Sequence, residues 1–587
     1  MLILKMNRKI KKLIFILPIV LLAVVAFYPN RLNRYVKRKF RAYAAAPKSE
    51  LKGVMFQRIE LVNMVKGPYT SLVIGPDHKL YASAIDGKIM RFLILPSGDL
   101  LLEHTFKPFG EVSKFTIGLA FDPASKSDSL IVWTTYAEGS SSWVKFPDSP
   151  EEHDKTNWAG CMARLHLNST TDQVLKNELV LQELPTFGPN HENYANSIVF
   201  GPDGKLYFGQ GANTGMGLCD CEENQEPSRE ALLSGAILYL DLNKLPKKLP
   251  IVVKTLDGGG SYDPYQVMAP LKIYATGLRN AYDMVWHSNG QLYTTINGSG
   301  GNENTPTSDP ESPYYIPPYI KINYTGSKDI PAVIGAQPDQ NDFMARVEQG
   351  GYYGHPNPLR AEYVLNYGDA ALDNSAYDGV VPDVNFKGFT YDFGPHVAPT
   401  GVVEYKSETF NGRLKGCLIV ARMGHNDLVL VRPDGEKKDI VKDYDGSEMG
   451  LELDSGPLDV VEDTKTGNIY VSEFGNKTIT LFHPIEKEAT RLVKEGGNKS
   501  KEILDPLEGG RVIYEQNCQI CHGAEGRGGI APSLVDRKWI NERDSMMLII
   551  ENGSGNGRMP AWKHKLSNKE IKWIEGYIIS LQKRAGH

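Results

Sequence analysis

SIVFGPDGKLYFGQ, residues 197–210, combines a short apolar strand, a turn of Gly, Pro and Asp, and a second strand that contains Tyr. The same unit recurs between about Lys52 and Pro484. Its six occurrences begin at Ser71, Ile117, Ser197, Asp283, Gly401 and Leu458. Each unit is too small to bury its own faces, so the repeat predicts a mainly β fold, six antiparallel sheets packed radially as a six-bladed β-propeller.

Long insertions separate these units, which start about 46 to 118 residues apart. The stretches around 138–160, 214–270 and 298–400 are rich in Gly, Pro, Asn and Tyr. Long loops on a rigid radial scaffold are common places for a binding site. A propeller that serves only for protein interaction is the alternative.

A second motif, YEQNCQICHG at residues 514–523, places Cys518, Cys521 and His522 in CxxCH spacing. At this spacing two thiols can bond to haem vinyl groups while the imidazole binds the iron. A redox disulfide or half of a zinc site is the alternative, but no second cysteine pair follows. Met559, in GRMPAW, offers a thioether to the other face of the iron, and His/Met ligation raises the reduction potential. The motif therefore predicts an electron-transfer haem.

Helical patterns flank the haem motif. Residues 506–517 predict an amphipathic helix, and residues 567–582 predict another, which begins with Ser567 and Glu570 in capping-box spacing. Together with the haem motif these features resemble a class I cytochrome c. The resemblance implies a small all-α domain at residues 505–587 with covalently bound haem c.

The N-terminus carries a basic stretch followed by the apolar residues Leu13–Tyr28. Sixteen helical residues span about 24 Å, against about 30 Å for a bilayer core. RLNRYVKRKFR follows, where a signal peptide would have its cleavage site. We therefore predict an apolar helix within residues 1–46 that is an uncleaved membrane anchor, with a cleaved signal peptide as the alternative.

Length and charge limit the remaining possibilities. The chain has 587 residues, enough for two hydrophobic cores, and its net charge of -5 gives no indication of a nucleic-acid partner. Resemblance to c-type cytochromes implies haem attachment outside the cytoplasm, so both domains are expected on the periplasmic side. There Cys161, Cys219, Cys221 and Cys417 can form disulfides, with a metal at Cys219 and Cys221 as the alternative.

Three further stretches resemble a known family. They are IYATGLRNAYDMVWHSNGQLYTTINGSGGNEN at residues 273–304, GGYYGHPNP at 350–358 and PHVAPTGVVEY at 395–405. Together they look like the soluble quinoprotein glucose dehydrogenase and sorbosone dehydrogenase group. Members of that group are six-bladed propellers that hold pyrroloquinoline quinone (PQQ) and calcium at one end of the central channel. The resemblance implies the same cofactors in residues 47–486.

The resemblance also implies roles for individual residues. His191 is expected to be the general base that removes the hydroxyl proton of a sugar. Arg279, in GLRN, is expected to pair with a PQQ carboxylate or with the oxygen where charge develops, while Asn280 orients the cofactor. A surface-loop histidine and an ion pair between blades are the alternatives for His191 and Arg279.

Asn297, Gly298 and Ser299 match positions that lie next to the cofactor in the family. The resemblance implies that Asn297 contacts PQQ and that Gly298 and Ser299 offer oxygens to Ca²⁺. A Gly-rich loop that only turns is the alternative.

Four other basic residues follow. His396 stands where relatives place a cofactor-facing residue, and Arg422 replaces a basic PQQ contact, with His425 as a nearby substitute. His355, in GGYYGHPNP, is assigned to a structural turn.

These features predict a periplasmic quinohaemoprotein dehydrogenase. It oxidises a sugar, or a related polyol or aldehyde, with PQQ and passes the electrons to its own haem. Residues 487–504, charged and Gly-containing, are the expected linker, and the downstream acceptor lies in the periplasm or membrane. Two alternatives remain: a propeller without PQQ that docks the cytochrome to a partner, and a calcium-dependent lactonase-like propeller.

Overall fold

The structure is a computed structural model of the chain. It describes residues 51–61, 64–138, 146, 158–186, 194–218, 229–299, 303–319, 329–335, 340–363, 375–395, 397–485, 506–523, 525–528, 531–535, 543–553, 559, 561–563, 566 and 568–584. The predicted N-terminal helix and the predicted linker lie outside these residues. In the part of the chain that is described, no helix is long and apolar enough to cross a membrane.

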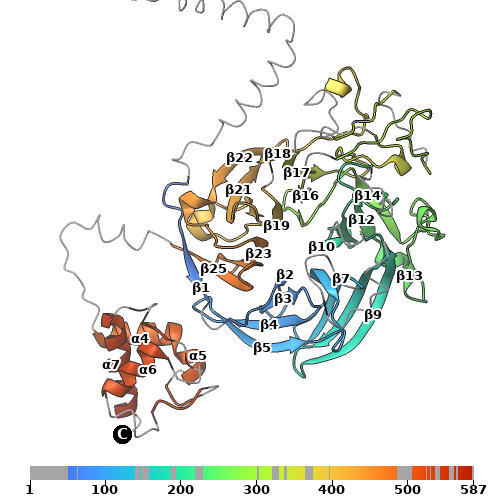
Figure 1. Cartoon of the computed structure of the whole chain (residues 1–587). Helices are drawn as coiled ribbons and strands as arrows, with labels where there is room; N and C mark the ends of the chain where they lie inside the picture. The colour runs from blue at the N-terminus through green and yellow to red at the C-terminus, as the bar shows by residue number, and fades with distance from the viewer. Residues whose placement is uncertain are drawn as a thin grey trace, which may run out of the picture.

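The described strands form six sheets around a common centre, numbered here as blades in chain order (Figure 1). Blade 1 contains β2 (Tyr69–Ile74), β3 (Leu80–Ala84), β4 (Ile89–Ile94) and β5 (Leu100–Phe106). Blade 2 contains β6 (Phe115–Phe121), β7 (Ser129–Ala137), β8 (Gly160–Asn168), β9 (Gln173–Leu184) and β13 (Ile251–Val252). Blade 3 contains β10 (Ala195–Phe200), β11 (Leu206–Gln210), β12 (Ala236–Leu240) and β14 (Leu271–Thr276).

The second half of the ring has the same plan. Blade 4 contains β15 (Met284–Trp286), β16 (Leu292–Ile296), β17 (Asn341–Val347) and β18 (Tyr391–Pro395). Blade 5 contains β19 (Pro399–Glu404), β20 (Leu418–Arg422), β21 (Asp427–Pro433) and β22 (Ile440–Asp445). Blade 6 contains β23 (Pro457–Asp463), β24 (Asn468–Glu473), β25 (Thr478–Pro484) and β1 (Phe56–Glu60). Each of the six sequence repeats forms the first two strands of one blade, which confirms the six-bladed propeller.

The ring is closed by a strand from the opposite end of the propeller sequence. β1 pairs antiparallel with β25, from Phe56 opposite Pro484 to Glu60 opposite Thr480, and the two strands lie side by side in Figure 1. Blade 6 is therefore built from both ends of the propeller. Closure of this kind leaves no unpaired gap between the first and last blades.

The apolar cores lie between neighbouring blades. One cluster, for example, joins Leu119 and Val132 of blade 2 to Tyr81 and Phe106 of blade 1. Corresponding clusters join each of the five remaining pairs of neighbouring blades. Because each sheet buries both faces against its neighbours, the ring holds the loops at its ends in fixed positions.

Among the described residues, the α-helices all lie after the propeller. They are α4 (Pro506–Asn517), α5 (Gln519–His522), α6 (Arg543–Asn552) and α7 (Asn568–Arg584). Their apolar side chains form a separate core that includes Tyr514, Met546, Trp562, Ile574 and Ile578. The 3-10 helices of the propeller loops are η3 (Leu242–Lys244), η4 (Leu256–Gly258), η5 (Pro358–Arg360), η7 (Ser375–Tyr377), η8 (Thr409–Gly412) and η9 (Gly446–Met449).

The cysteines differ from the expectation. Cys161 and Cys417 are buried free thiols in blade 2 and next to blade 5, so the disulfide prediction is wrong for these two. Burial in an apolar core raises the pKa of the Cys161 thiol to about 12. Cys219 and Cys221 lie outside the described residues.

Candidate functional site

The predicted propeller residues that the structure describes lie at one end of the ring. In an antiparallel blade the first strand begins, and the second strand ends, at the same edge. Arg279 and Asn280 precede the first strand of blade 4, and Asn297 to Ser299 follow its second strand. Arg422 ends the second strand of blade 5. His191 and His396 lie outside the described residues, so their roles stay predictions.

Arg279 is a cation with unused hydrogen-bonding capacity. Its Nη1 donates to the carbonyl of Gly298 at 3.1 Å, while its Nε is buried and has no partner among the described residues. Burial lowers the pKa of Arg279, although Glu303, Asp342 and Glu230 attract the charge. No ion pair to a described carboxylate holds this guanidinium, so it can bind an anionic or carbonyl oxygen of a ligand.

Asn280 and Asn297 belong to a chain of amides that crosses three blades. The Asn196 side chain donates to the amide oxygen of Asn280 at 2.8 Å, and Asn280 donates to that of Asn297 at 3.1 Å. Asn297 in turn donates to the carbonyl of Pro399 at 3.0 Å. Both predicted residues therefore use their oxygen and nitrogen within the protein, and they hold the loops of blades 3, 4 and 5 together.

Gly298 and Ser299 are tightly packed. The N–H of Gly298 donates to the Asp342 carboxylate at 2.7 Å. Ser299 is fully buried; its carbonyl accepts from the N–H of Gln340 at 2.8 Å, and its hydroxyl donates to the carbonyl of Gly215. Within the described residues no group of three or more His, Cys, Asp or Glu side chains is arranged to hold a metal ion. Calcium binding by these backbone oxygens stays a prediction.

Arg422 is already paired. Its Nε donates to the Asp427 carboxylate at 2.8 Å, and its Nη2 donates to the second oxygen of the same group. His425, its predicted substitute, is exposed in the turn that joins β20 to β21. A PQQ contact by Arg422 would have to compete with a bidentate ion pair.

A buried carboxylate–imidazole pair, Glu230 and His355, lies next to the GLRN loop, and no local sequence pattern predicts it. Glu230 accepts from Nε2 of His355 at 3.0 Å, from the N–H groups of Asn213 and Thr214 at 3.1 and 3.0 Å, and from the hydroxyls of Thr214 and Ser234. Burial alone would raise the pKa of Glu230, but the hydrogen bond and charge of His355, with the two hydroxyls, lower it. The carboxylate is therefore ionised.

His355 is thus more than the turn residue that the sequence indicates. Its Nδ1 is buried without a partner among the described residues, and so is the amide oxygen of Asn213. The backbone N–H of His355 donates to the carbonyl of Gly277 at 2.9 Å, two residues before Arg279. The backbone N–H of Ala212, next to Asn213, donates to the carbonyl of Arg279 at 2.6 Å. The orphaned atoms therefore lie on segments that are hydrogen-bonded to one another. Such an arrangement fits a polar ligand.

Polar side chains also bridge the centre of the ring. The Tyr282 hydroxyl donates to the carbonyl of Thr70 at 3.2 Å and so connects blade 4 to blade 1 on the opposite side. Asp283 and Asp459 each accept a hydrogen bond from a backbone N–H of the following blade, at 2.8 and 2.6 Å. Burial raises the pKa of Asp283 to about 6 and, with repulsion from Asp283, raises that of Asp459 well above its usual range.

Two of the predicted haem-binding residues lie at the apolar core of the C-terminal domain. Cys518 and Met559 both pack against the cluster that contains Tyr514. His522 lies in α5, and its Nδ1 is 2.9 Å from the carbonyl of Pro532. An Nδ1–H that donates to this carbonyl leaves the lone pair on Nε2 for iron, as in other histidine metal ligands. Cys521 also lies in α5, and the structure describes its backbone but not its side chain.

The fold and these sites define a class of protein in which a six-bladed propeller and a c-type cytochrome domain are fused in one chain. Residues 505–578 match the family described as cytochrome C oxidase, cbb3-type, subunit III. The C-terminal segment is therefore a cytochrome c domain, and such a domain implies haem.

Curated relatives match a part of the chain. The cbb3-type cytochrome c oxidase subunit CcoP of Azospirillum brasilense is 30% identical over 148 residues, 24% of this chain and 47% of that protein. FixP of Bradyrhizobium diazoefficiens is 38% identical over 121 residues, 20% of this chain and 41% of that protein. The chain thus spans less than half the length of these relatives.

Solved structures with a similar fold cover the propeller. A putative oxidoreductase (glucose dehydrogenase) of Thermus thermophilus is 17% identical, covers 73% of this chain and 100% of its own, and has a TM-score of 0.43. The PQQ-bound aldose sugar dehydrogenase of Streptomyces coelicolor is 14% identical, covers 74% and 98%, and has a TM-score of 0.42. These identities are too low to transfer a substrate or a cofactor.

Proposed function

We propose that this protein is a PQQ-dependent dehydrogenase of sugars, or of related polyols or aldehydes, that delivers electrons to its own c-type haem. The observation that carries the proposal is Arg279, a buried cation whose Nε has no partner in the part of the chain that the structure describes. We further propose that the protein works on the periplasmic side, is anchored by residues 1–46 and passes electrons to a periplasmic or membrane acceptor.

The residues present fit PQQ, a small planar molecule with carboxylates and two adjacent carbonyl oxygens. Arg279 has a hydrogen bond to give, and the loop that carries it is held by the Glu230–His355 pair and by the amide chain through Asn280 and Asn297. When bound there, PQQ supplies a two-electron acceptor. In this proposal Ca²⁺, a hard cation that prefers oxygen ligands, binds the backbone oxygens of Gly298 and Ser299 in place of the hydrogen bonds that they accept from Arg279 and Gln340.

The chain supplies a base and an electrostatic contact for the reaction. Oxidation of a CH–OH group to a carbonyl removes two electrons and two protons. His191 accepts the hydroxyl proton, and Arg279 stabilises negative charge where it develops. The remaining proton and the one from His191 are released to solvent, because the haem iron takes up electrons only.

The haem residues suit this relay. His522 and Met559 would hold the haem iron, and such ligation would supply a one-electron acceptor of raised reduction potential. Covalent fusion replaces a diffusional encounter with a high effective concentration of the acceptor. Residues 487–504 then act as the connection between donor and acceptor.

Reconstitution of the full-length protein tests the proposal. Purified protein is loaded with PQQ and Ca²⁺ and given a panel of aldoses, polyols and aldehydes while the haem absorbance is followed. Haem reduction that depends on PQQ and on a substrate supports the dehydrogenase. An oxidised haem with every substrate, despite bound PQQ, contradicts it, and hydrolysis of sugar lactones without haem reduction favours a lactonase instead.

A further inference from the structure

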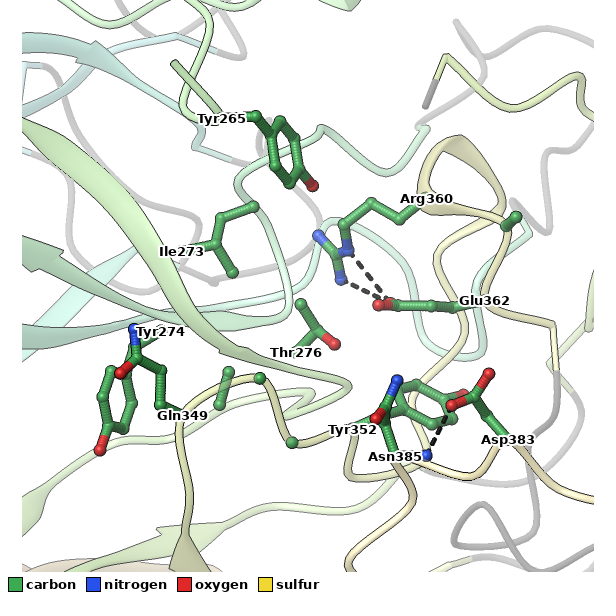
Figure 2. A pocket seen from close by; sticks show the side chains of 14 residues that line it. Tyr265, Ile273, Tyr274, Thr276, Gln349, Tyr352, Arg360, Glu362, Asp383 and Asn385 are labelled. Atoms are coloured by element: carbon green, nitrogen blue, oxygen red, sulfur yellow. Dashed lines mark hydrogen bonds and ion pairs between the residues drawn. The ribbon is translucent and has the colours of Figure 1, made fainter. Parts of the chain in front are cut away.

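A cavity of 240 Å³ lies away from the centre of the ring, between blade 3 and the loops of blade 4 (Figure 2). One wall is β14, the outermost strand of blade 3, and the other consists of residues 349–352, residues 360–362, Asp383 and Asn385, all between β17 and β18. The volume is below the roughly 300 Å³ at which pockets for drug-sized ligands begin, so it suits a smaller molecule.

A buried ion pair forms one side of the cavity. Nε and Nη2 of Arg360 donate to one oxygen of Glu362 at 3.1 and 2.9 Å, as Figure 2 shows. Nη1 of Arg360 donates to the carbonyls of Leu232 and Ser234, both at 2.8 Å. The Arg360 side chain is fully buried and that of Glu362 is 9% exposed. The two charges cancel, and the pair presents donors and acceptors in a fixed geometry.

Other groups at the cavity have hydrogen bonds to offer. Among the described residues, the hydroxyl of Tyr265 and the side-chain amides of Gln349 and Asn385 have no intramolecular partner, and all three lie around the cavity in Figure 2. Tyr265 also presents an aromatic face, and Ile273 adds an apolar patch. Aromatic faces beside mixed donors and acceptors suit a molecule with both C–H and O–H surfaces.

The charge of the cavity selects against anions. Arg360 is the single cation among the described residues that line it, and Glu362 and Asp383 are both acidic. Asp383 is buried, and its carboxylate accepts a hydrogen bond from the N–H of Asn385 at 2.7 Å. The lining therefore carries a net negative charge, which repels carboxylates and phosphates.

We propose that this cavity is a second small-molecule site, which binds one neutral monosaccharide or polyol. The size, the aromatic wall, the unused amides and the charge all agree with such a ligand. The lining residues include none of those assigned to the central channel, so this site is distinct from the proposed oxidation site and does not depend on its chemistry.

Calorimetric titration of the full-length, cofactor-free protein with D-glucose tests the proposal, with D-glucuronate as the matched anionic probe. We expect saturable glucose binding and at least about tenfold weaker glucuronate binding, because the probes differ by one carboxylate. Tyr265→Ala is expected to raise the Kd for glucose about fivefold to tenfold, and Tyr265→Phe to change it less than about threefold. Hydrogen exchange of residues 349–352 and 383–386 is expected to slow when glucose is present.

Three further variants separate this site from the channel. Gln349→Ala with Asn385→Ala is expected to weaken glucose binding, whereas the matched exposed pair Gln57→Ala with Asn243→Ala leaves it unchanged. Arg279→Met, in the channel, is also expected to leave it unchanged. The proposal is overturned if no saturable glucose binding occurs, or if Arg279→Met abolishes binding while the cavity variants do not. Neither result bears on PQQ-dependent haem reduction, which is measured separately.

Discussion

Arg279→Met decides whether this side chain serves a ligand or the fold. The guanidinium donates one hydrogen bond within the described residues, from Nη1 to the Gly298 carbonyl at 3.1 Å, and its Nε is buried without a partner. Loss of a charged hydrogen bond costs about 1.5–3 kcal/mol, while removal of an unsatisfied buried donor returns about 1–3 kcal/mol. Because these effects offset one another, we expect the free energy of unfolding to stay within about 1 kcal/mol of the wild-type value.

The same substitution is expected to weaken PQQ binding. A charge-assisted hydrogen bond contributes about 1.5–3 kcal/mol, which corresponds to a rise of about 10- to 150-fold in Kd. Titration of the cofactor-free protein with PQQ and Ca²⁺, followed by tryptophan fluorescence, measures the Kd. Urea unfolding followed by circular dichroism measures the stability of the same samples.

Arg91→Met is the matched control. The Arg91 side chain is 5% exposed and forms ion pairs with Glu103 at 3.0 Å and Asp172 at 2.7 Å. Loss of a hydrogen bond to a charged group costs about 1.5–3 kcal/mol, so this variant should lose stability and keep its affinity for PQQ. If Arg279→Met instead loses about 3 kcal/mol and leaves the Kd for PQQ unchanged, Arg279 is a structural residue and the reasoning is refuted.

Three other outcomes are expected. Met559→Ala should lower the haem reduction potential by on the order of 0.1 V in a redox titration, because the weakly donating thioether is lost; an unchanged potential would exclude Met559 as the axial ligand. Glu230→Gln should lower the free energy of unfolding by about 3 kcal/mol, measured with urea. The reason is that the new amide NH₂ would face N–H donors whose hydrogen bonds the carboxylate oxygen accepted. Burial raises the pKa of Asp283 to about 6, so the folded protein keeps a proton on this group that the unfolded chain releases near pH 4. The free energy of unfolding therefore falls as the pH rises from about 4 to about 6. Relative to the wild type, Asp283→Asn should therefore gain about 3 kcal/mol of stability between pH 4 and pH 7, and a pH-independent difference would contradict the burial argument.

The repeated hairpins could be predicted because their signal is local. In residues 197–210 the alternation of apolar side chains and the Pro-Asp-Gly turn specify two paired strands, and these form β10 and β11. The other five units behave in the same way. When six such hairpins pack in a ring, each sheet buries both of its faces against its neighbours.

Contacts between distant parts of the chain could not be predicted. β1 pairs with β25 across more than four hundred residues of sequence, and nothing local in FQRIE specifies that partner. The Glu230–His355 pair joins residues 125 positions apart. His355 was assigned to a turn because Gly and Pro surround it, while its buried carboxylate partner became visible only in the folded chain.

Adjacent residues of one sequence motif have different hydrogen bonding in the folded protein. Arg279 and Asn280 are neighbours in GLRN. Asn280 uses both its amide oxygen and its amide nitrogen within the protein, whereas Nε of Arg279 is buried with no partner among the described residues. Asn213 and His355 each add another unpartnered buried atom on adjoining segments. Each such atom costs about 1–3 kcal/mol, so the folded protein holds a penalty here that a polar ligand or ordered water can remove. The satisfied amides fix the loops, and the unsatisfied atoms between them are where binding energy is still available.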